Sequence, residues 1–332
     1  IGFRIGFGSR PLACPKFGAA AELDVGTAAC HVGGDGYLDF EVKQADIKSG
    51  NAVVAVTKNG TVLWSWHLWF APKDALDKIP VTNHQGKVYN FTKETLGWKP
   101  TQWSGSTYDK PRTVKVKVEQ TVANNGTKQE AVINITQKPG NVRKGATTLY
   151  QFGRKDAFPG VDASKLATNS HFTENAGDNM SIENGIQHPD KFYTFGPSWY
   201  STPPTGYSYY NLWSADNTVT GGWNVGNDNL VVKTVYDPSP VGFKMPANNA
   251  FTGFTADGQN NGTMNVDGTD DLQTFSNNFG HNFWTSSSKT ATINFPASGF
   301  RFSNGGSLTD VGRSGYYWLA VPGSSSNGCD LL

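Results

Sequence analysis

The segment NAVVAVTKNGTVLWSW, Asn51 to Trp66, decides the fold class. Two runs rich in β-branched and aromatic residues flank the tetrapeptide Lys58-Asn59-Gly60-Thr61. Asn-Gly between such runs is the strongest short-range indication of a β-hairpin, because both central positions of its turn need a positive φ. The segment therefore predicts an antiparallel hairpin, and the chain around it repeats the pattern.

Three more segments alternate apolar and polar residues with the period of a strand. YLDFEVK, from Tyr37, predicts a half-buried strand. TVKVKVEQTV (113–122) and EAVINITQ (130–137) flank a second Asn-Gly turn, which predicts a second hairpin. The residues expected to face the core there are Val114, Val116, Val118 and, according to the register, Val132 or Ile133.

The pattern of apolar and polar residues changes near residue 145. Residues 37–140 are typical of antiparallel β structure, whereas short apolar pieces separated by polar loops follow Tyr150. Short helical turns are expected only after Asp178 and at 247–254. We predict a mainly β chain with an α+β part: a sandwich-like antiparallel region at 1–145, in which 1–35 is undetermined, and a second domain at 146–332.

The composition excludes several classes of protein. The chain has 332 residues, of which 13% are aromatic and 17% charged, against a usual charged share of about 25%. So many aromatic residues exclude a disordered chain, and no apolar run of about 18 residues is present. The net charge is +1, so no nucleic-acid partner is predicted.

The three cysteines, Cys14, Cys30 and Cys329, are too few for a disulfide scaffold. Cys14 and Cys30 either form one bridge or remain free buried thiols. The chain begins at Ile1 without an initiator Met or a signal peptide, which favours a fragment or a processed form. Low charge with many Asn, Thr, Ser, Gly and Trp residues is typical of secreted β proteins.

Five motifs in a fixed order carry a resemblance to a known family. They are SGNAVVAVTKNGTVLWSWHLWF (Ser49 to Phe70), LYQFGRKDAFPG (Leu149 to Gly160), KTVYDPSPVGFKMP (Lys233 to Pro246), NFWTSSS (Asn282 to Ser288) and GYYWLAVP (Gly315 to Pro322). This order resembles Bacteroides-type fimbrillin-like surface proteins, the tip or minor subunits of type V pili. The last four motifs also look like the Fibrobacter succinogenes major paralogous domain.

The resemblance implies a C-type-lectin-like domain at 146–332, related in topology to the formylglycine-generating sulfatase-modifying domain. This sequence departs from the family pattern at Ser239, where the family has Cys, and at Phe243, where it has Trp. The chain ends in GCDLL instead of the family's last strand, so we expect a domain truncated at its C-terminus. The cysteine chemistry of the formylglycine-generating enzymes is not carried over, because this region contains only Cys329.

Catalytic and metal-binding patterns are weak. None of the six histidines lies in a metal or triad motif, and His67 is expected to be a buried, hydrogen-bonded structural residue. Arg154, Lys155 and Asp156 are expected to form a turn with a salt-bridged arginine. No cofactor is predicted. Calcium is the alternative that we do not favour, since two acidic or amide-rich turns lack the EF-hand spacing: Asp267, Asp270 and Asp271, and Asn224, Asn227, Asp228 and Asn229.

Aromatic residues give the strongest indication of a binding site. Sugars stack on Trp and Tyr rings while amides and carboxylates bond their hydroxyls, and residues 193–229 concentrate these types. The alternative is that these rings are core residues under long loops, as we expect for Trp64, Trp66, Trp284 and Trp318. The candidate ligand-binding residues are Trp199, Tyr209, Tyr210, Trp213, Asp216, Trp223, Asn224 and Asp228.

These observations favour a non-enzymatic extracellular protein: a pilus tip or cell-surface adhesin of a Gram-negative anaerobe. Its lectin-like domain would present loops around 193–229 and 255–275 to a glycan or a host surface protein. The resemblance implies other pilus subunits as partners through strand exchange. One alternative is a purely structural or assembly subunit. Another is a carbohydrate-active enzyme or its binding module, which requires paired carboxylates.

Overall fold

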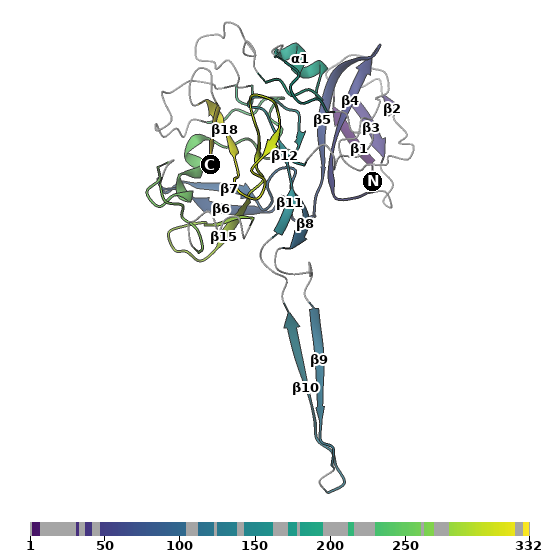
Figure 1. Ribbon diagram of the computed structural model, residues 1–332, viewed down its shortest axis with the longest axis vertical. Helices are drawn as coiled ribbons and strands as arrows, with labels where there is room; N and C mark the ends of the chain where they lie inside the picture. Colours follow the sequence, from purple (N-terminus) through teal and green to yellow (C-terminus); the bar gives the residue numbers. More distant parts are fainter. Residues whose placement is uncertain are drawn as a thin grey trace.

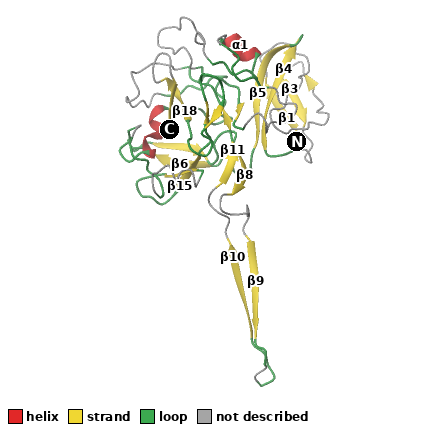
Figure 2. Cartoon of the chain, in the orientation of Figure 1, coloured by secondary structure: helices red, strands yellow, loops and turns green. Residues whose placement is uncertain are grey.

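The computed structural model describes residues 2–6, 31–32, 37–41, 47–103, 112–122, 125–137, 143–161, 172–177, 180–194, 212–215, 230–259, 262–268, 279–322 and 328–331. In this part of the chain, strands and loops dominate, and the predicted mainly β class is confirmed (Figure 1 and Figure 2). The sheets are small, and the strand pairs within them are antiparallel.

The described elements follow one another in a simple order. The strands of the first half are β1 (Gly2–Gly6), β2 (His31–Val32), β3 (Tyr37–Glu41), β4 (Gly50–Lys58), β5 (Thr61–Phe70), β6 (Lys78–Thr82), β7 (Val88–Thr92), β8 (Lys99–Trp103), β9 (Arg112–Glu119), β10 (Glu130–Gln137) and β11 (Arg143–Ala146). Those of the second half are β12 (Thr148–Leu149), β13 (Phe158–Pro159), β14 (Gly280–Trp284), β15 (Thr292–Pro296), β16 (Phe300–Arg301), β17 (Leu308–Thr309), β18 (Tyr317–Pro322) and β19 (Gly328–Leu331). The helices are α1 (Ile182–Gln187) and the 3-10 helix η3 (Asn248–Phe254), where short helical turns were predicted.

Most sheets pair two strands that are neighbours in the sequence. One sheet has three strands in the order β1-β3-β2. The two-stranded sheets are β4-β5, β6-β7, β8-β11, β9-β10, β12-β13, β14-β15, β16-β17 and β18-β19. Tertiary packing between these ribbons, rather than one large sheet, must therefore hold the described chain together.

The hairpin predicted from NAVVAVTKNGTVLWSW is confirmed as β4 and β5. Asn59 and Gly60 form its turn with φ of 51° and 85°, the positive values that the Asn-Gly prediction requires. Along β4, burial alternates, and Ala52, Val54 and Val56 are buried. The hairpin therefore presents one regular apolar face from β4.

The second hairpin is also confirmed, as β9 and β10, with Asn125 and Gly126 at positive φ in its turn. The prediction that Val114, Val116, Val118 and either Val132 or Ile133 face the core is wrong, because all five side chains are exposed. The hairpin extends away from the rest of the chain instead of folding back onto it (Figure 1). The alternation of apolar and polar residues identified the apolar face of the hairpin. It did not show whether another part of the protein covers that face.

The larger core cluster joins residues from both predicted domains. Val81 of β6 is completely buried against aromatic and aliphatic side chains of η3, β14, β15 and β18. The backbone N–H of Thr82 also donates to the carbonyl oxygen of Thr285 at 2.8 Å. This cluster therefore contains residues from both sides of position 145. The cluster consists of Val81, Phe251, Phe254, Val266, Phe283, Ile293, Phe295 and Leu319.

A second cluster forms around Trp213, which is completely buried. Its ring contacts Phe152 with centroids 5.2 Å apart, and Phe152 in turn contacts Trp318 at 5.5 Å. Trp318 packs on this cluster while remaining partly exposed. The other tryptophans expected in the core, Trp64, Trp66 and Trp284, are also only partly buried.

A buried arginine connects helix α1 to the segment that follows β12. The Arg154 guanidinium is 2% exposed and donates to the carbonyl oxygens of His188 at 2.9 Å and Gly185 at 3.4 Å, at the C-terminal end of α1. Helix C-termini favour cations and leave carbonyl oxygens without helical partners, so the contact stabilises the end of this short helix. The same group donates to the Lys191 carbonyl at 2.5 Å.

The two residues after Arg154 attach this segment to strand β5. The Asp156 carboxylate accepts hydrogen bonds from Lys155 Nζ at 2.6 Å and from the Ser65 hydroxyl at 2.7 Å, while Lys155 Nζ also donates to Ser65. Burial lowers the pKa of the Lys155 ammonium, and the nearby Asp156 charge opposes that shift. The predicted turn with a salt-bridged arginine is thus a buried charge network of Arg154, Lys155, Asp156 and Ser65.

A substitution at Phe254 tests whether the larger core cluster is packed as described. Its side chain is completely buried and contacts the rings of Phe91, Phe251, Phe283 and Phe295. Phe254→Ala should lower the free energy of unfolding in urea by about 3–5 kcal/mol, because it leaves a cavity among packed rings. The control Phe302→Ala, at a side chain that is 45% exposed, should cost less than about 1 kcal/mol. Equal losses in the two variants would contradict the described core.

Candidate functional site

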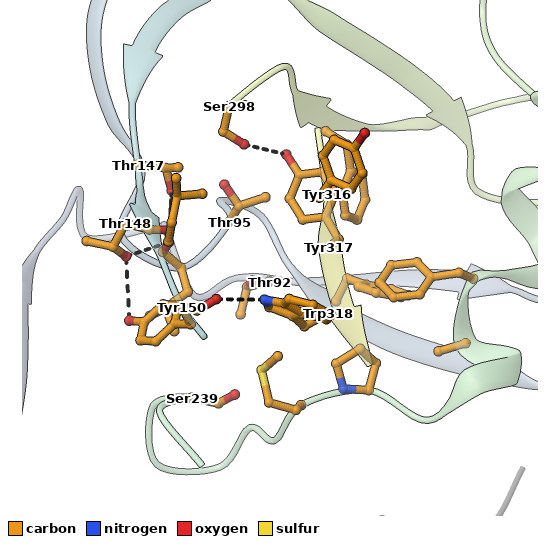
Figure 3. Close-up of a pocket in the computed structure, with 18 of the residues that line it drawn as sticks. Thr92, Thr95, Thr147, Thr148, Tyr150, Ser239, Ser298, Tyr316, Tyr317 and Trp318 are labelled. Atoms are coloured by element: carbon orange, nitrogen blue, oxygen red, sulfur yellow. Dashed lines mark hydrogen bonds between the residues drawn. The ribbon is translucent and has the colours of Figure 1, made fainter. Parts of the chain in front are cut away.

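A cavity of about 830 Å³ lies between the two core clusters. Its volume is within the range of pockets that hold small ligands, about 300–1,000 Å³. Residues of both clusters line it, including Phe152 and Val231 from one and Phe251 and Phe295 from the other. Figure 3 shows several of the lining residues, which come from segments distant in the sequence.

Aromatic rings form much of the cavity wall. They come from β7, from the segment after β12, from the Lys233–Pro246 motif and from the last third of the chain. Exposed or partly exposed rings at this wall are available to stack on an apolar ligand face. The partly or fully exposed aromatic lining residues are Tyr89, Phe91, Tyr150, Phe243, Phe300, Phe302, Tyr316, Tyr317 and Trp318.

Hydroxyl groups supply most of the polar part of the lining. Figure 3 shows Thr92, Thr95, Thr147, Thr148, Tyr150, Ser239, Ser298, Tyr316 and Tyr317 around the cavity. Most of those described have partners inside the protein; for example, Tyr317 Oη donates to the Pro296 carbonyl at 2.5 Å. The buried Thr95 Oγ1 differs, because it has no hydrogen-bond partner among the described residues. An unpaired buried hydroxyl is costly, and this oxygen is enclosed by protein atoms, so it is not open to a ligand in the cavity.

The buried charge network shapes one wall of the cavity. Arg154 donates to Gln151 Oε1 at 2.9 Å, and Gln151 Nε2 donates to the Tyr193 carbonyl at 2.6 Å. The Arg154 guanidinium also lies over the Phe158 ring at 4.8 Å and the Tyr193 ring at 5.6 Å. Gln151, Phe158 and Tyr193 all line the cavity, so the charged groups behind them set the positions of these residues.

Two further motif residues fix the opposite parts of the lining. Trp318 Nε1 donates to the Tyr150 carbonyl at 2.8 Å, which joins β18 to the segment after β12 (Figure 3). The buried Asp237 carboxylate accepts from the backbone N–H groups of Ser239 at 2.8 Å and Met245 at 2.9 Å. It thereby closes the loop that carries Ser239, Phe243 and Met245 into the cavity lining.

His67 confirms the sequence-based prediction of a hydrogen-bonded structural histidine. The Asn51 amide donates to the Gly97 carbonyl at 2.8 Å, so its Oδ1 accepts from His67 Nε2 at 2.8 Å. His67 Nδ1 then accepts from the Tyr150 hydroxyl at 2.6 Å. Both contacts suit the neutral ring, and burial lowers the pKa of His67 to about 4. Because Tyr150 lines the cavity, this chain of hydrogen bonds holds one of its rings from behind.

The described lining carries basic and no acidic side chains. The basic residues are Lys78, Lys87, Lys244 and Arg301. Arg301 is paired with Glu174 at 2.9 Å, and Lys87 lies 5.3 Å from the centre of the Tyr89 ring. Among the described lining residues, no aspartate, glutamate, histidine or cysteine occurs. The cavity thus offers hydrophobic contact, hydroxyl and amide hydrogen bonds, and positive charge.

The structure tests one of the eight candidate ligand-binding residues. Trp213 is not a surface residue: it is completely buried, and its Nε1 donates to the Arg154 carbonyl at 2.9 Å. It is therefore a core residue, which corrects its place in the candidate set. The other seven lie outside the described residues: Trp199, Tyr209, Tyr210, Asp216, Trp223, Asn224 and Asp228.

Sequence reasoning did not identify the cavity. It treated Trp318 as a core residue and did not consider Tyr150, Tyr316 or Thr95, because no spacing rule brings these positions together. The only available indication was that the motif residues Tyr150, Phe243 and Trp318 belong to segments rich in aromatic residues. These three residues line the same cavity only because their segments pack together in the folded chain.

Neither a metal-ligand cluster nor a membrane-spanning helix occurs in the part of the chain that the structure describes. It contains no group of three or more His, Cys, Asp or Glu side chains placed to hold a metal ion. Of the seven residues in the two calcium candidates, Asp267 is described and is exposed, and the others lie outside the described residues, as do Cys14 and Cys30. Within the same residues, no helix has the length and apolarity needed to cross a membrane.

Comparisons with models of known protein families, with curated proteins and with solved structures find no significant match to this chain.

The lowered pKa of His67 predicts a pH-dependent stability. The unfolded ring has a pKa of about 6.5 and the native ring about 4, so the unfolded state binds more protons between these values. The stabilising contribution is present above about pH 6.5 and falls as the pH decreases toward 4. Between about pH 7 and pH 5, the wild-type free energy of unfolding should fall by about 2 kcal/mol more than that of His67→Gln. Parallel pH profiles of the two proteins, measured by urea unfolding, would contradict this role.

Proposed function

We propose that this chain is an extracellular binding protein, a pilus tip or cell-surface adhesin, whose aromatic cavity holds a glycan. The single observation that carries the proposal is the cavity of about 830 Å³ lined by aromatic rings and hydroxyl groups. Carbohydrate rings place their apolar C–H faces on Trp, Tyr or Phe rings while their hydroxyls exchange hydrogen bonds with polar groups. The cavity offers both kinds of contact side by side.

The charge of the lining favours an acidic glycan over a neutral one. Lys78, Lys87 and Lys244 are exposed lining residues, and the described lining supplies no carboxylate to oppose them. A sugar carboxylate or sulfate at this rim would gain an attraction that salt screens. We therefore propose a glycan that carries uronic-acid-like or sulfate groups as the ligand class.

Binding is favoured over hydrolysis by the kinds of groups available. Glycoside hydrolysis needs two carboxyl groups on either side of the scissile bond, roughly 5–10 Å apart. The side chains that we can place around the cavity are hydroxyl, amide, amino and aromatic groups. These groups orient and hold a ligand, so we propose recognition without catalysis and assign no cofactor.

The pilus setting rests on the motif order and remains part of the proposal. The motifs that resemble fimbrillin-like and Fibrobacter succinogenes major paralogous domains contribute Arg154, Asp237 and Trp318, which support the cavity. A C-type-lectin-like arrangement of 146–332 would place a ligand among such loops. Other pilus subunits, joined by strand exchange, are the partners that this setting implies.

Phe243 provides the sharpest test of ligand binding. Its ring lines the cavity and is partly exposed, so it is available to stack on a sugar. After acidic ligands are found on a glycan array, calorimetric titration compares the wild type with Phe243→Ala. Phe243→Ala should weaken binding at least about tenfold through loss of a stacking ring.

The control is Thr263→Val, at an exposed threonine outside the cavity lining, which should bind as the wild type does. Affinity for the acidic ligand should also decrease as salt increases. The proposal fails if the chain binds no glycan on a broad array, or if Phe243→Ala binds like the control.

A further inference from the structure

The projecting hairpin β9–β10 carries a continuous apolar face that has no known role. Residues paired directly across an antiparallel ladder point to the same side, and three successive alternate pairs are apolar: Val114 with Ile135, Val116 with Ile133, and Val118 with Ala131. We call these six residues the apolar stripe. The valines and isoleucines of the stripe are 38–60% exposed.

An exposed apolar stripe on a hairpin is stabilised when another surface packs against it. A two-stranded hairpin alone is at best marginally stable in water, and it becomes stable when its apolar face packs on another layer. Every side chain described in residues 113–122 and 125–136 is exposed, and the hairpin extends away from the rest of the chain (Figure 1). The described part of this chain therefore does not provide the second layer.

The opposite face of the hairpin is mostly polar, with Val132 as its one apolar residue among positions 113–119 and 130–136. Lys117 pairs with Glu130 at 2.5 Å and with Glu119 at 3.2 Å, and Lys128 reaches Glu119 at 3.5 Å. The hydroxyls of Thr113 and Thr136 lie 3.1 Å apart. These ion pairs lie on the face opposite the stripe, and the charged position on the stripe's own face is Arg112, at the start of β9 beyond Val114. The stripe itself can therefore be buried without burying an ion.

We propose that the apolar stripe packs against the same stripe of a second copy of this chain. The second copy supplies a cover of matching length, whose six contacting residues are uncharged and are themselves exposed to water. Two hairpins stacked face to face would form a two-layer, four-stranded β-sandwich with layers about 10 Å apart. This inference is independent of the ligand that the cavity binds.

The projection of the hairpin selects one arrangement of the two copies. In a two-fold pair the hairpins run either in the same direction, which brings the two bodies together, or in opposite directions, which places them at opposite ends. The second arrangement lets the stripes meet along their whole length without a collision of bodies (Figure 1). The central pair, Val116 and Ile133, then lies at the two-fold axis and faces its own counterpart.

The area of the contact sets the expected affinity. Covering both stripes would bury roughly 900 Å² of accessible surface, counted over both copies. Stable specific interfaces usually bury about 1,200–2,000 Å². The dimer should therefore be weak, with a dissociation constant in the micromolar range. It would form wherever copies are concentrated, as on a cell surface.

Sedimentation equilibrium of the full chain, up to about 100 µM, tests this proposal. The wild type should dimerise, and Val116→Lys should weaken dimerisation at least about tenfold by placing a charge at the centre of the contact. The matched control is Thr136→Lys, which adds the same charge to the same hairpin on its polar face and should leave the dimer intact.

A second measurement keeps the test valid if Val116→Lys disrupts the hairpin itself. A photo-reactive benzophenone residue at position 116 should crosslink two copies in high yield, whereas the same residue at position 136 should not. A wild type that stays monomeric at about 100 µM would overturn the proposal and assign the stripe to another protein. A dimer that tolerates Val116→Lys, or that crosslinks equally from both positions, would overturn it too.

Discussion

The buried charge network of Arg154, Lys155, Asp156 and Ser65 is the interaction on which the rest of the structure depends. Small two-stranded sheets cannot hold a chain of this length together, so contacts between ribbons must do so. The network joins strand β5, helix α1 and the 191–193 segment through one short stretch of backbone. Removing one partner from a buried ion pair leaves a charge without compensation, which typically costs about 3–5 kcal/mol.

The cavity follows from this network. Arg154 positions Gln151 and the rings of Phe158 and Tyr193, while its carbonyl oxygen accepts from Trp213 in the second core cluster. Trp318 and Asp237 complete the frame from other segments. Charged residues in these positions therefore support the cavity wall from behind, while rings and hydroxyl groups form the surface of the cavity. Charged residues that could be taken for functional groups in the sequence therefore act as structural supports.

Sequence reasoning succeeded where the physical cause is local. Asn59-Gly60 and Asn125-Gly126 determine their turns through backbone conformation, and both hairpins followed from them. His67 was also predicted well, because a histidine among apolar strand residues needs internal hydrogen bonds. Burial was harder to predict: Val114 has the pattern of a core residue yet is exposed, and Trp213 was chosen as a surface residue yet is buried. Both depend on which segments pack together, which one sequence does not state, and the cavity depends on the same information.

The role of Asp156 is the point at which the account is most directly tested. Asp156→Asn keeps the shape of the side chain but leaves Arg154 and Lys155 buried without their carboxylate. The matched control is Glu174→Gln, which removes the partly exposed partner of Arg301. The measurement is urea unfolding combined with hydrogen exchange. We predict that Asp156→Asn lowers the free energy of unfolding by about 3–5 kcal/mol and speeds exchange in β5 and α1, whereas the control costs less than about 1 kcal/mol. An Asp156→Asn protein as stable and as protected as the control would contradict the account.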